Sequence, residues 1–267
     1  MSKKAFAVLG DPIGQSLSPK IHQAAYKYLA LDYSYEAIRV ASGNLEFFVK
    51  ENPKDFDGFS ITMPLKFEAS TIAQEYSDLV GTGVANTLVR SDTGWTGYNT
   101  DVAGITFALA KCFQTSPSTV AVLGAGATAR SALVATSNAG ISNVTLYARD
   151  MAKANSLDIL AKTLGLKLGI RELSSFGSQQ ELTINTLPAG VADTLAITGS
   201  LRGWLLSANY SGTDQRFTAL FSPANVIPGV EMLLGQAFEQ IRLFSSQDIE
   251  FASVDSAELL LAMRAAL

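Results

Sequence analysis

The sequence predicts an α/β protein with a largely parallel sheet, and three observations support this fold class. Short apolar runs alternate with segments of helical periodicity along most of the chain. A glycine-rich turn separates one apolar run from an alanine-rich helical segment near residue 124. Apolar residues make up 48% of the 267 residues and charged residues only 16%, which is ample for a buried core. This length favours two domains.

The first hundred residues begin with an apolar strand over Ala5–Gly10 and a turn at residues 11–14. A helix is expected next, with Ser18 as its N-cap, Pro19 at its first position and an apolar face that includes Ile21. The remaining elements expected here are strands over 33–40, 58–63 and 85–90 and a helix over 44–50.

The second part of the chain starts with a helix expected over 102–113, and the polar loop 114–118 behind it is the best candidate for a domain boundary. A new strand and helix pair follows at once, which indicates a βαβ unit. The expected strands are 119–124, 143–147, 182–187 and 203–208, and the expected helices are 127–139, 151–164, 231–244 and 256–267.

Composition excludes several classes of function. The net charge is −4 without a basic run, so nucleic acid is not an expected partner. No stretch reaches the roughly 18 apolar residues of a membrane span, and the first apolar run is too short for a signal peptide, so we expect a cytoplasmic protein. The single cysteine, Cys112, excludes an internal disulfide and a cysteine-rich metal site, and its apolar neighbours predict a buried filler.

The glycine-rich turn contains Gly124, Gly126 and Ala129 in the spacing G-x-G-x-x-A. This pattern alone can mean only a tight turn. Here it follows an expected strand and opens an expected helix, so backbone N–H groups face the place that a dinucleotide pyrophosphate would occupy. The context therefore favours a dinucleotide-binding fold over a plain turn.

The residues after the next strand favour NADP over NAD. Ala148 cannot hold a ribose hydroxyl, whereas Arg149 and Lys153 could bind a 2′-phosphate, with Arg130 nearby. The alternative is that these residues are a solvated helix start, and Asp150 would repel a phosphate if it faced the site.

Four polar motifs lie in the first 101 residues: Ser16–Pro19, Ser60–Lys66, Ala85–Thr87 and Asn99–Asp101. Each has an ordinary explanation when taken alone. Ser18 could be only a helix cap, Asn86 a turn former, Asp101 a cap for the helix after it, and Lys66 a surface lysine.

Together with the glycine-rich turn, these motifs resemble the shikimate dehydrogenase family along nearly the whole chain. The motifs that carry the resemblance are Ser16-Leu-Ser18-Pro19, Thr62-Met-Pro-Leu-Lys66, Asn86-Thr87, Asn99-Thr100-Asp101, Gly124-Ala-Gly126-Ala-Thr-Ala-Arg130 and Gly229-Val-Glu-Met232-Leu-Leu-Gly-Gln236-Ala237. The resemblance implies an N-terminal α/β substrate-binding domain over 1–101, with the C-terminal helices of 231–267 packed back on it. It also implies a Rossmann-type NADP-binding domain over 102–230 and an active site in the cleft between the two domains.

The resemblance implies an oxidoreductase that interconverts shikimate and 3-dehydroshikimate with NADP, a step toward aromatic amino acids. Oxidation of a secondary alcohol sends a hydride to the nicotinamide and needs a group that accepts the hydroxyl proton. The family uses the lysine and aspartate that match Lys66 and Asp101, which we expect to act as a coupled pair. The only histidine, His22, lies inside a helical pattern and is expected to be a packed residue.

The other matching residues are expected to bind the substrate and the cofactor. Ser16 and Ser18 would hold the substrate carboxylate at a helix N-terminus, and Tyr210 would add a contact near it. The ring hydroxyls would be bound by Thr62, Asn86 and Gln236. The cofactor-binding residues would be Gly124, Ala125, Gly126, Ala127, Thr128, Arg130, Ala148, Arg149, Lys153, Gly229 and Met232, and no metal is expected.

Several positions depart from the family pattern. Tyr98 and Ser207 stand where Asp is common, Ser60 where many members have Asn, and Ala148 where Asn is usual. Two alternatives therefore stay open: an NAD-dependent quinate/shikimate dehydrogenase, and a non-catalytic dinucleotide-binding regulator. Ser18 and Ala148 oppose the first, and the retained Lys66 and Asp101 oppose the second. A monomer and a homodimer are both compatible with the sequence.

Overall fold

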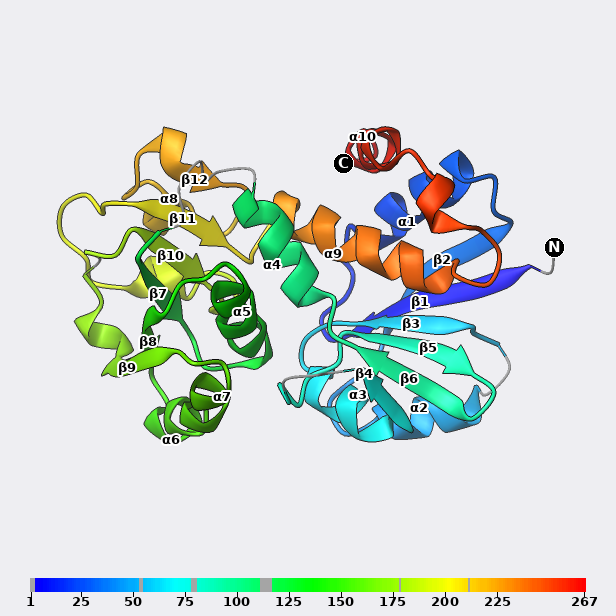
Figure 1. Ribbon diagram of the computed structural model, residues 1–267, viewed down its shortest axis with the longest axis horizontal. Helices are drawn as coiled ribbons and strands as arrows, with labels where there is room; N and C mark the ends of the chain where they lie inside the picture. Colours follow the sequence, from blue (N-terminus) through cyan, green and yellow to red (C-terminus); the bar gives the residue numbers. More distant parts are fainter. Residues whose placement is uncertain (1–2, 53–54, 78–80, 111–116, 178, 211) are drawn as a thin grey trace. The chain divides into compact units, whose positions relative to one another are not determined.

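The computed structural model describes residues 3–52, 55–77, 81–110, 117–177, 179–210 and 212–267. The chain divides into two compact units. The first contains Met1–Leu79, Gly83–Thr100 and Gln236–Leu267, and the second contains Val80–Thr82 and Asp101–Gly235 (Figure 1). Cys112 lies outside the described residues, as does most of the loop at 114–118.

The first unit is built on a six-stranded mixed sheet with the order β2-β1-β3-β5-β6-β4. The parallel pairs are β1 with β2, β1 with β3 and β4 with β6, whereas β5 runs antiparallel to both of its neighbours. The strands are β1 (Lys4–Gly10), β2 (Tyr33–Arg39), β3 (Gly58–Ile61), β4 (Glu75–Ser77), β5 (Thr87–Ser91) and β6 (Gly94–Tyr98). The helices are α1 (Ser18–Tyr28), α2 (Leu45–Glu51), α3 (Lys66–Ile72), the part of α9 (Gly229–Phe244) that begins at Gln236, and α10 (Ser256–Arg264).

Helices cover both faces of this sheet. Figure 1 shows α2 and α3 on one face, and α1 with the last part of α9 on the other. On the α2–α3 face, Phe59 and Leu88 are fully buried together with Leu65 and Leu45. On the other face, Phe6 stacks on Phe244 of α9 with ring centroids 4.5 Å apart. These contacts fix α9 against the sheet, which matters below because α9 carries Gln236.

The second unit is a parallel six-stranded sheet with the order β12-β11-β10-β7-β8-β9. Its strands are β7 (Thr119–Leu123), β8 (Asn143–Ala148), β9 (Lys167–Glu172), β10 (Leu182–Asn185), β11 (Trp204–Ser207) and β12 (Val226–Ile227), and its helices are α4 (Asp101–Ala110), α5 (Ala127–Asn138), α6 (Met151–Asn155), α7 (Asp158–Thr163), α8 (Gln215–Thr218) and the first part of α9. The chain builds outward from β7 to β9 and then returns to build from β10 to β12. This reversal between β7 and β10 is the switch point where Rossmann folds bind dinucleotides.

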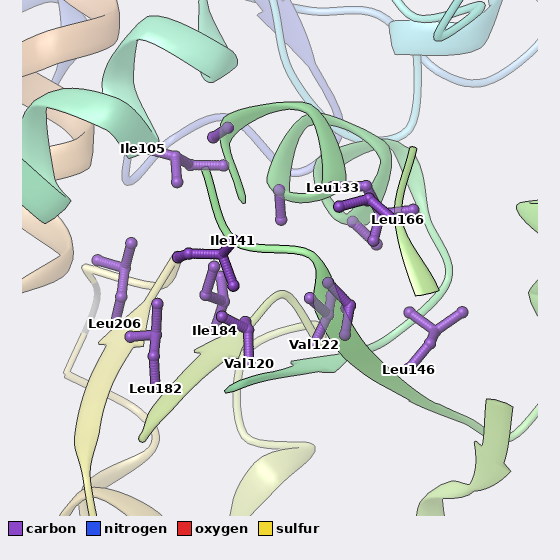
Figure 2. Packing of buried hydrophobic residues seen from close by; sticks show 14 of the residues in the cluster. Ile105, Val120, Val122, Leu133, Ile141, Leu146, Leu166, Leu182, Ile184 and Leu206 are labelled. Atoms are coloured by element: carbon purple, nitrogen blue, oxygen red, sulfur yellow. The ribbon is translucent and has the colours of Figure 1, made fainter. Parts of the chain in front are cut away.

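The core of the second unit is aliphatic. Figure 2 shows Val120, Val122 and Ile184 of the central strands in one cluster with Leu133 of α5 and with Ile141, which follows α5 in the sequence. Strands buried on both faces read as continuous apolar runs, which explains why β7 and β10 were predicted correctly from sequence. The predicted fold class, α/β with a Rossmann-type second part, is confirmed.

Some predicted elements differ in the structure. The helix expected over 151–164 is two short helices, α6 and α7, separated at Ser156 and Leu157. The strands β4, β6, β9 and β12 and the helices α3 and α8 were not predicted. Of the longer strands, β6 contains two glycines, and β9 is a largely exposed edge strand without an apolar run. Among the residues that the structure describes, no helix combines the length and the apolar character needed to cross a lipid bilayer.

Candidate active site

The polar motifs of the first unit meet at one edge of its sheet. The carboxyl ends of β1 and β3 lie at this edge because the two strands are parallel. The register pairs Ser60 with Thr87 and Thr87 with Tyr98, so β5 begins and β6 ends at the same edge. We call residues 60–66, 85–87 and 98–100 the polar edge. Three motifs that are separated in the sequence are therefore neighbours in the structure.

Backbone hydrogen bonds fix the loop that leads to Lys66. Thr62 N–H donates to Leu9 O at 2.9 Å, and Leu65 N–H donates to Thr62 O at 2.9 Å. A Cβ on Gly10 would lie 2.3 Å from Thr62 Cγ2, so this close approach of β1 requires glycine. Lys66 is the first residue of α3 and is half-buried, and its carbonyl accepts from Ala85 N–H at 3.0 Å. The backbone of Lys66 is therefore held in a fixed place at the polar edge.

Asn86 ties the polar edge together. Its backbone N–H donates to Tyr98 O at 3.0 Å, and its carbonyl accepts from Ile61 N–H at 2.7 Å. Its side chain is buried: Oδ1 accepts from Thr100 N–H at 2.7 Å, and Nδ2 donates to Thr100 Oγ1 at 2.9 Å. Asn86 therefore holds the backbone of the residue that directly precedes Asp101.

Asp101 is the first residue of α4 and is 3% exposed. A carboxylate in the first turn of a helix is stabilised by the unsatisfied N–H groups there. Asp101 belongs to the second unit and Lys66 to the first. Their expected roles as a proton-transfer pair remain a prediction.

The two serines lie at the start of α1, but not in the expected arrangement. Leu17 is the N-cap and Ser18 is the first helical residue, so the prediction that Ser18 caps the helix is wrong. The helix begins one residue earlier than predicted, and Ser16 Oγ accepts from the N–H of Ser18 at 3.3 Å. Pro19 is the second helical residue, one position later than predicted, and still lies in the first turn. Both serines still lie where helix N–H groups favour an anion.

Helix α9 carries two buried glutamines one turn apart. Gln236 is 9% exposed, and Gln240 is on the same face of the helix. Gln240 Nε2 donates to Asn86 O at 3.3 Å and to Thr87 Oγ1 at 3.0 Å. Gln240 was not predicted to belong to the site, although a second glutamine four residues after Gln236 on a largely apolar helix indicates a buried polar contact.

The glycine-rich turn of the second unit has the shape that a phosphate site needs. Gly124 has φ +105°, a value that favours glycine, and a Cβ there would lie 2.8 Å from Thr186 Oγ1. Gly126 is the N-cap of α5, and an added Cβ would meet nothing within 4 Å. The first N–H groups of α5 have no intrahelical partners and open onto this space. Thr186, which directly follows the neighbouring β10 and donates from Oγ1 to Leu123 O, was missed because this contact depends on the strand order.

The residues after β8 match the expected 2′-phosphate site in part. Ala148 is buried, and Arg149 and Lys153 are exposed. Asp150 is the N-cap of α6: its Oδ1 accepts from Lys153 N–H at 3.0 Å. Arg130 reaches the end of α6 and donates from Nη2 to Ser156 Oγ at 3.4 Å. Three basic residues thus lie at or beside one short helix, and the carboxylate among them caps this helix and lies 3.8 Å from Lys153 Nζ.

A buried carboxylate organises the loops after β10 and β11. Asp214 is 5% exposed and accepts from Asn209 Nδ2 at 2.7 Å and from Gly190 N–H at 2.9 Å. Asn185 Nδ2 lies 3.3 Å from Ser207 Oγ and 3.5 Å from Asp214 Oδ2. A carboxylate is therefore present beside Ser207, where the family commonly has Asp, but it comes from a later loop.

Two further predicted cofactor residues lie close to these loops. A Cβ on Gly229 would lie 2.5 Å from Asn209 O, so the start of α9 packs against this backbone. Met232 is buried in the core of the same unit. Tyr210, the predicted substrate residue of this unit, is half-buried in the loop after β11.

The only histidine is not available for proton transfer at neutral pH. His22 is fully buried, stacks on Tyr35 with ring centroids 4.0 Å apart, and has Nδ1 3.2 Å from Tyr26 Oη. Burial lowers its pKa to about 3, and a hydrogen bond with Gln240 opposes that shift only in part. Within the part of the chain that the structure describes, no cluster of His, Cys, Asp or Glu could hold a metal ion.

Comparison with known proteins is consistent with both units. Residues 8–88 match the family model described as the shikimate dehydrogenase substrate binding domain. A protein named shikimate dehydrogenase (NADP(+)) from Nitrosopumilus maritimus is 30% identical over 268 residues, which covers 96% of this chain and 98% of the relative.

Solved structures agree over the whole chain. The crystal structure of Mycobacterium tuberculosis shikimate dehydrogenase has 34% identity and a TM-score of 0.81, covering 99% of this chain and 100% of the other. Shikimate 5-dehydrogenase from Thermus thermophilus, solved in complex with NADP(H) and shikimate, has 28% identity and a TM-score of 0.80, with coverage of 99% and 100%.

Proposed function

Because the chain belongs to the shikimate dehydrogenase family, we propose that it is an NADP-dependent oxidoreductase that interconverts shikimate and 3-dehydroshikimate. The observation that carries the proposal is the full-length similarity to relatives whose names state this activity and this cofactor. The reaction belongs to the route toward chorismate and aromatic amino acids.

Lys66 and Asp101 handle the proton in this proposal. Bound NADP supplies the hydride acceptor. The protein must orient the secondary hydroxyl and take up its proton, and no histidine is available for that task. Lys66 has a fixed backbone at the start of α3, and the backbone before Asp101 is held by Asn86. We assign these two side chains to the hydroxyl as a coupled pair.

The substrate carboxylate and ring hydroxyls have different partners. Ser16 and Ser18, at the N-terminus of α1, are assigned to the carboxylate, and Tyr210 is assigned to a contact near it. Thr62, Asn86 and Gln236 are assigned to the ring hydroxyls. The support for this assignment is that Thr62 and Asn86 lie at the polar edge, and that α9 brings Gln236 one turn from a residue bonded to Asn86.

The second unit has the features that NADP needs. The open space at Gly126 and the free N–H groups of α5 suit a pyrophosphate, which the backbone of Gly124, Ala125, Gly126, Ala127 and Thr128 would hold. Arg149, Lys153 and Arg130 suit a 2′-phosphate, with Ala148 beside the ribose. Gly229 and Met232 are assigned to the nicotinamide side.

We further propose that residues 1–101 with 231–267 form the substrate domain and residues 102–230 the cofactor domain, and that residues of both domains contribute to the active site. The compact units divide at nearby positions, after Thr100 and after Gly235. The protein is proposed to work in the cytoplasm as a monomer or homodimer on small molecules.

The first test is the initial rate of nicotinamide reduction with shikimate and with quinate, each with NADP and with NAD. We expect turnover with shikimate and NADP that exceeds the other three rates by at least about tenfold, since Arg149 and Lys153 offer charge to a 2′-phosphate. Comparable rates with NAD or quinate would assign the chain to the quinate/shikimate type. No turnover in any of the four assays would favour the alternative that the protein is a non-catalytic dinucleotide-binding regulator.

A further inference from the structure

Gln240 is a buried amide for which the proposed reaction has no direct use. It is 1% exposed on α9, and a buried amide is unfavourable unless it is hydrogen-bonded. Its Oε1 accepts from Ser60 Oγ at 2.9 Å, and its Nε2 donates to Thr87 Oγ1 at 3.0 Å and to Asn86 O at 3.3 Å. These three partners lie at the polar edge, and the His22 side chain of α1 is a further hydrogen-bond partner of Gln240.

The hydrogen bonds form a chain with a single direction. Tyr35 Oη donates to Ser60 Oγ at 2.6 Å, and Ser60 donates onward to Gln240 Oε1. Gln240 Nε2 donates to Thr87 Oγ1, and Thr87 donates to Asn86 Oδ1 at 3.0 Å. The carbonyl of Gln240 thus faces Ser60 and its amino group faces Thr87. The hydrogen bonds in such a buried series strengthen one another, and each group sets the orientation of the next.

The series of hydrogen bonds ends at a group that can only donate. Thr100 N–H is a backbone group that only donates, and Asn86 Oδ1 accepts from it at 2.7 Å. Thr87 Oγ1 accepts from Gln240 Nε2 and donates to the same Oδ1 of Asn86. If the Asn86 amide turned over, Nδ2 would face two donors. Gln240 and Thr100 therefore act from opposite sides to select one orientation of Asn86.

We propose that Gln240 is a positioning residue that acts through Thr87 to hold the Asn86 amide in a single orientation at the polar edge. The inference rests on the proposed function, in which Asn86 binds a ring hydroxyl of the substrate. A polyhydroxylated ring is recognised by donors and acceptors at set places, so an amide with its oxygen and nitrogen exchanged binds it poorly. Ser60 has the matching role of orienting Gln240.

The proposal predicts an effect on one substrate only. When Gln240 is replaced by Met, which keeps the length without the amide, the KM for shikimate should rise about tenfold. The KM for NADP should stay within about twofold, because the hydrogen-bonded chain lies wholly within the first unit. General destabilisation of the fold would not separate the two constants in this way.

Thr87 supplies a matched pair of variants. Thr87→Val removes the hydroxyl that relays Gln240 to Asn86, whereas Thr87→Ser keeps it. We expect Thr87→Val to raise the shikimate KM about as much as Gln240→Met, and Thr87→Ser to remain within about twofold of wild type. Ser245→Ala is the control, since Ser245 is a buried residue directly after α9 whose hydroxyl donates to Ile241 O of that helix.

The decisive experiment measures both KM values and kcat for these variants and for Gln240→Met in the Asn86→Ala background. The double variant should lose little beyond Asn86→Ala alone if Gln240 acts through Asn86. Additive losses, equal rises in both KM values, or wild-type constants in Gln240→Met and Thr87→Val would each overturn the proposal. If Gln240→Met does not fold by circular dichroism, the Thr87 pair decides. Absence of wild-type turnover would refute the proposed function and this inference together, whereas an active wild type with unaffected variants refutes only the inference.

Discussion

The two units prepare their binding edges by different means. At the polar edge of the first unit, side chains determine the shape: Asn86, Thr87 and Gln240 are buried and hydrogen-bonded to one another. At the switch point of the second unit, the backbone determines the shape: Gly124 has a positive φ and Gly126 leaves an open space before α5. Buried side-chain bonds in the second unit, such as those of Asp214, hold its loops.

The difference follows from the proposed ligands. A ring with several hydroxyls needs donors and acceptors in fixed directions, which only oriented side chains supply. A pyrophosphate needs several N–H groups at close range, and any side chain in between would keep it away. The first edge should therefore be sensitive to the removal of polar atoms, and the second to the addition of carbon atoms.

The largest expected effect comes from Lys66→Ala at the polar edge. Loss of the proposed proton acceptor should lower kcat by about 10²–10⁴ with a far smaller change in shikimate affinity. Steady-state kinetics with Lys27→Ala as a control, an exposed lysine in the last turn of α1, would show the effect to be local. An equal loss in kcat and affinity, or no loss, would remove Lys66 from proton transfer.

The glycines of the second unit should separate stability from cofactor binding. Gly124→Ala places a Cβ at a positive φ and against Thr186, and should lower the free energy of unfolding by about 1–3 kcal/mol. Gly126→Ala meets no atom, so it should keep the stability while it weakens NADP binding about tenfold.

Urea unfolding and NADP titration would measure the two effects. Gly177→Ala is the control, because its added Cβ also meets nothing and it lies away from the turn. Unchanged NADP affinity in Gly126→Ala would contradict the assignment of this turn to the pyrophosphate.

Arg149→Ala tests the preference for NADP over NAD. Removal of one guanidinium from a 2′-phosphate should weaken NADP about tenfold and leave NAD unaffected. The ratio of kcat/KM values for the two cofactors is the readout, with the exposed Arg202→Ala as a control for charge. If both cofactors lose equally, Arg149 does not contact the 2′-phosphate.

The smallest expected effect is a pH dependence of stability from His22. Its pKa is about 3 in the folded protein and about 6.5 in the unfolded chain. Below pH 6.5 the unfolded state therefore binds a proton that the folded state does not, and stability falls as the pH drops toward 3, by at most about 1.4 kcal/mol per pH unit.

His22→Phe should remove this contribution. Between pH 7.5 and 5.5, urea unfolding of wild type should lose about 1.4 kcal/mol more than the variant, since the chain has no other histidine. Tyr26→Phe, which removes the phenol that contacts His22, should keep the wild-type slope. Parallel pH profiles for wild type and His22→Phe would show that the imidazole is not held neutral.

Local patterns predicted much of the fold. The apolar runs at 119–124 and 182–187 became the central strands β7 and β10, and the family prediction is confirmed by relatives over the whole chain. Strands without a local signal were missed: β6 owes its place to pairing with β5. The N-cap prediction for Ser18 failed because the helix begins one residue earlier, so Ser18 is itself helical and donates its N–H to Ser16 Oγ.

The candidate site divides in the same way. Motifs such as Thr62–Lys66 and Gly124–Arg130 were recognisable because their chemistry is contained in a few consecutive residues. Gln240 and Asp214 were not, because each is an ordinary polar residue in its own segment. Gln240 meets Asn86 across 154 residues of sequence, and Asp214 meets Asn185 across 29.

The sequence by itself determined the family, the α/β class and the residues that carry the proposed chemistry, since apolar periodicity and short motifs are local properties. The tertiary structure alone decided which buried polar groups satisfy one another. A buried amide or carboxylate must find its partners wherever the strand order brings them, and hydrogen bonds act only over about 3 Å. The orientation of Asn86 is therefore a property of the fold, although its identity is a property of the sequence.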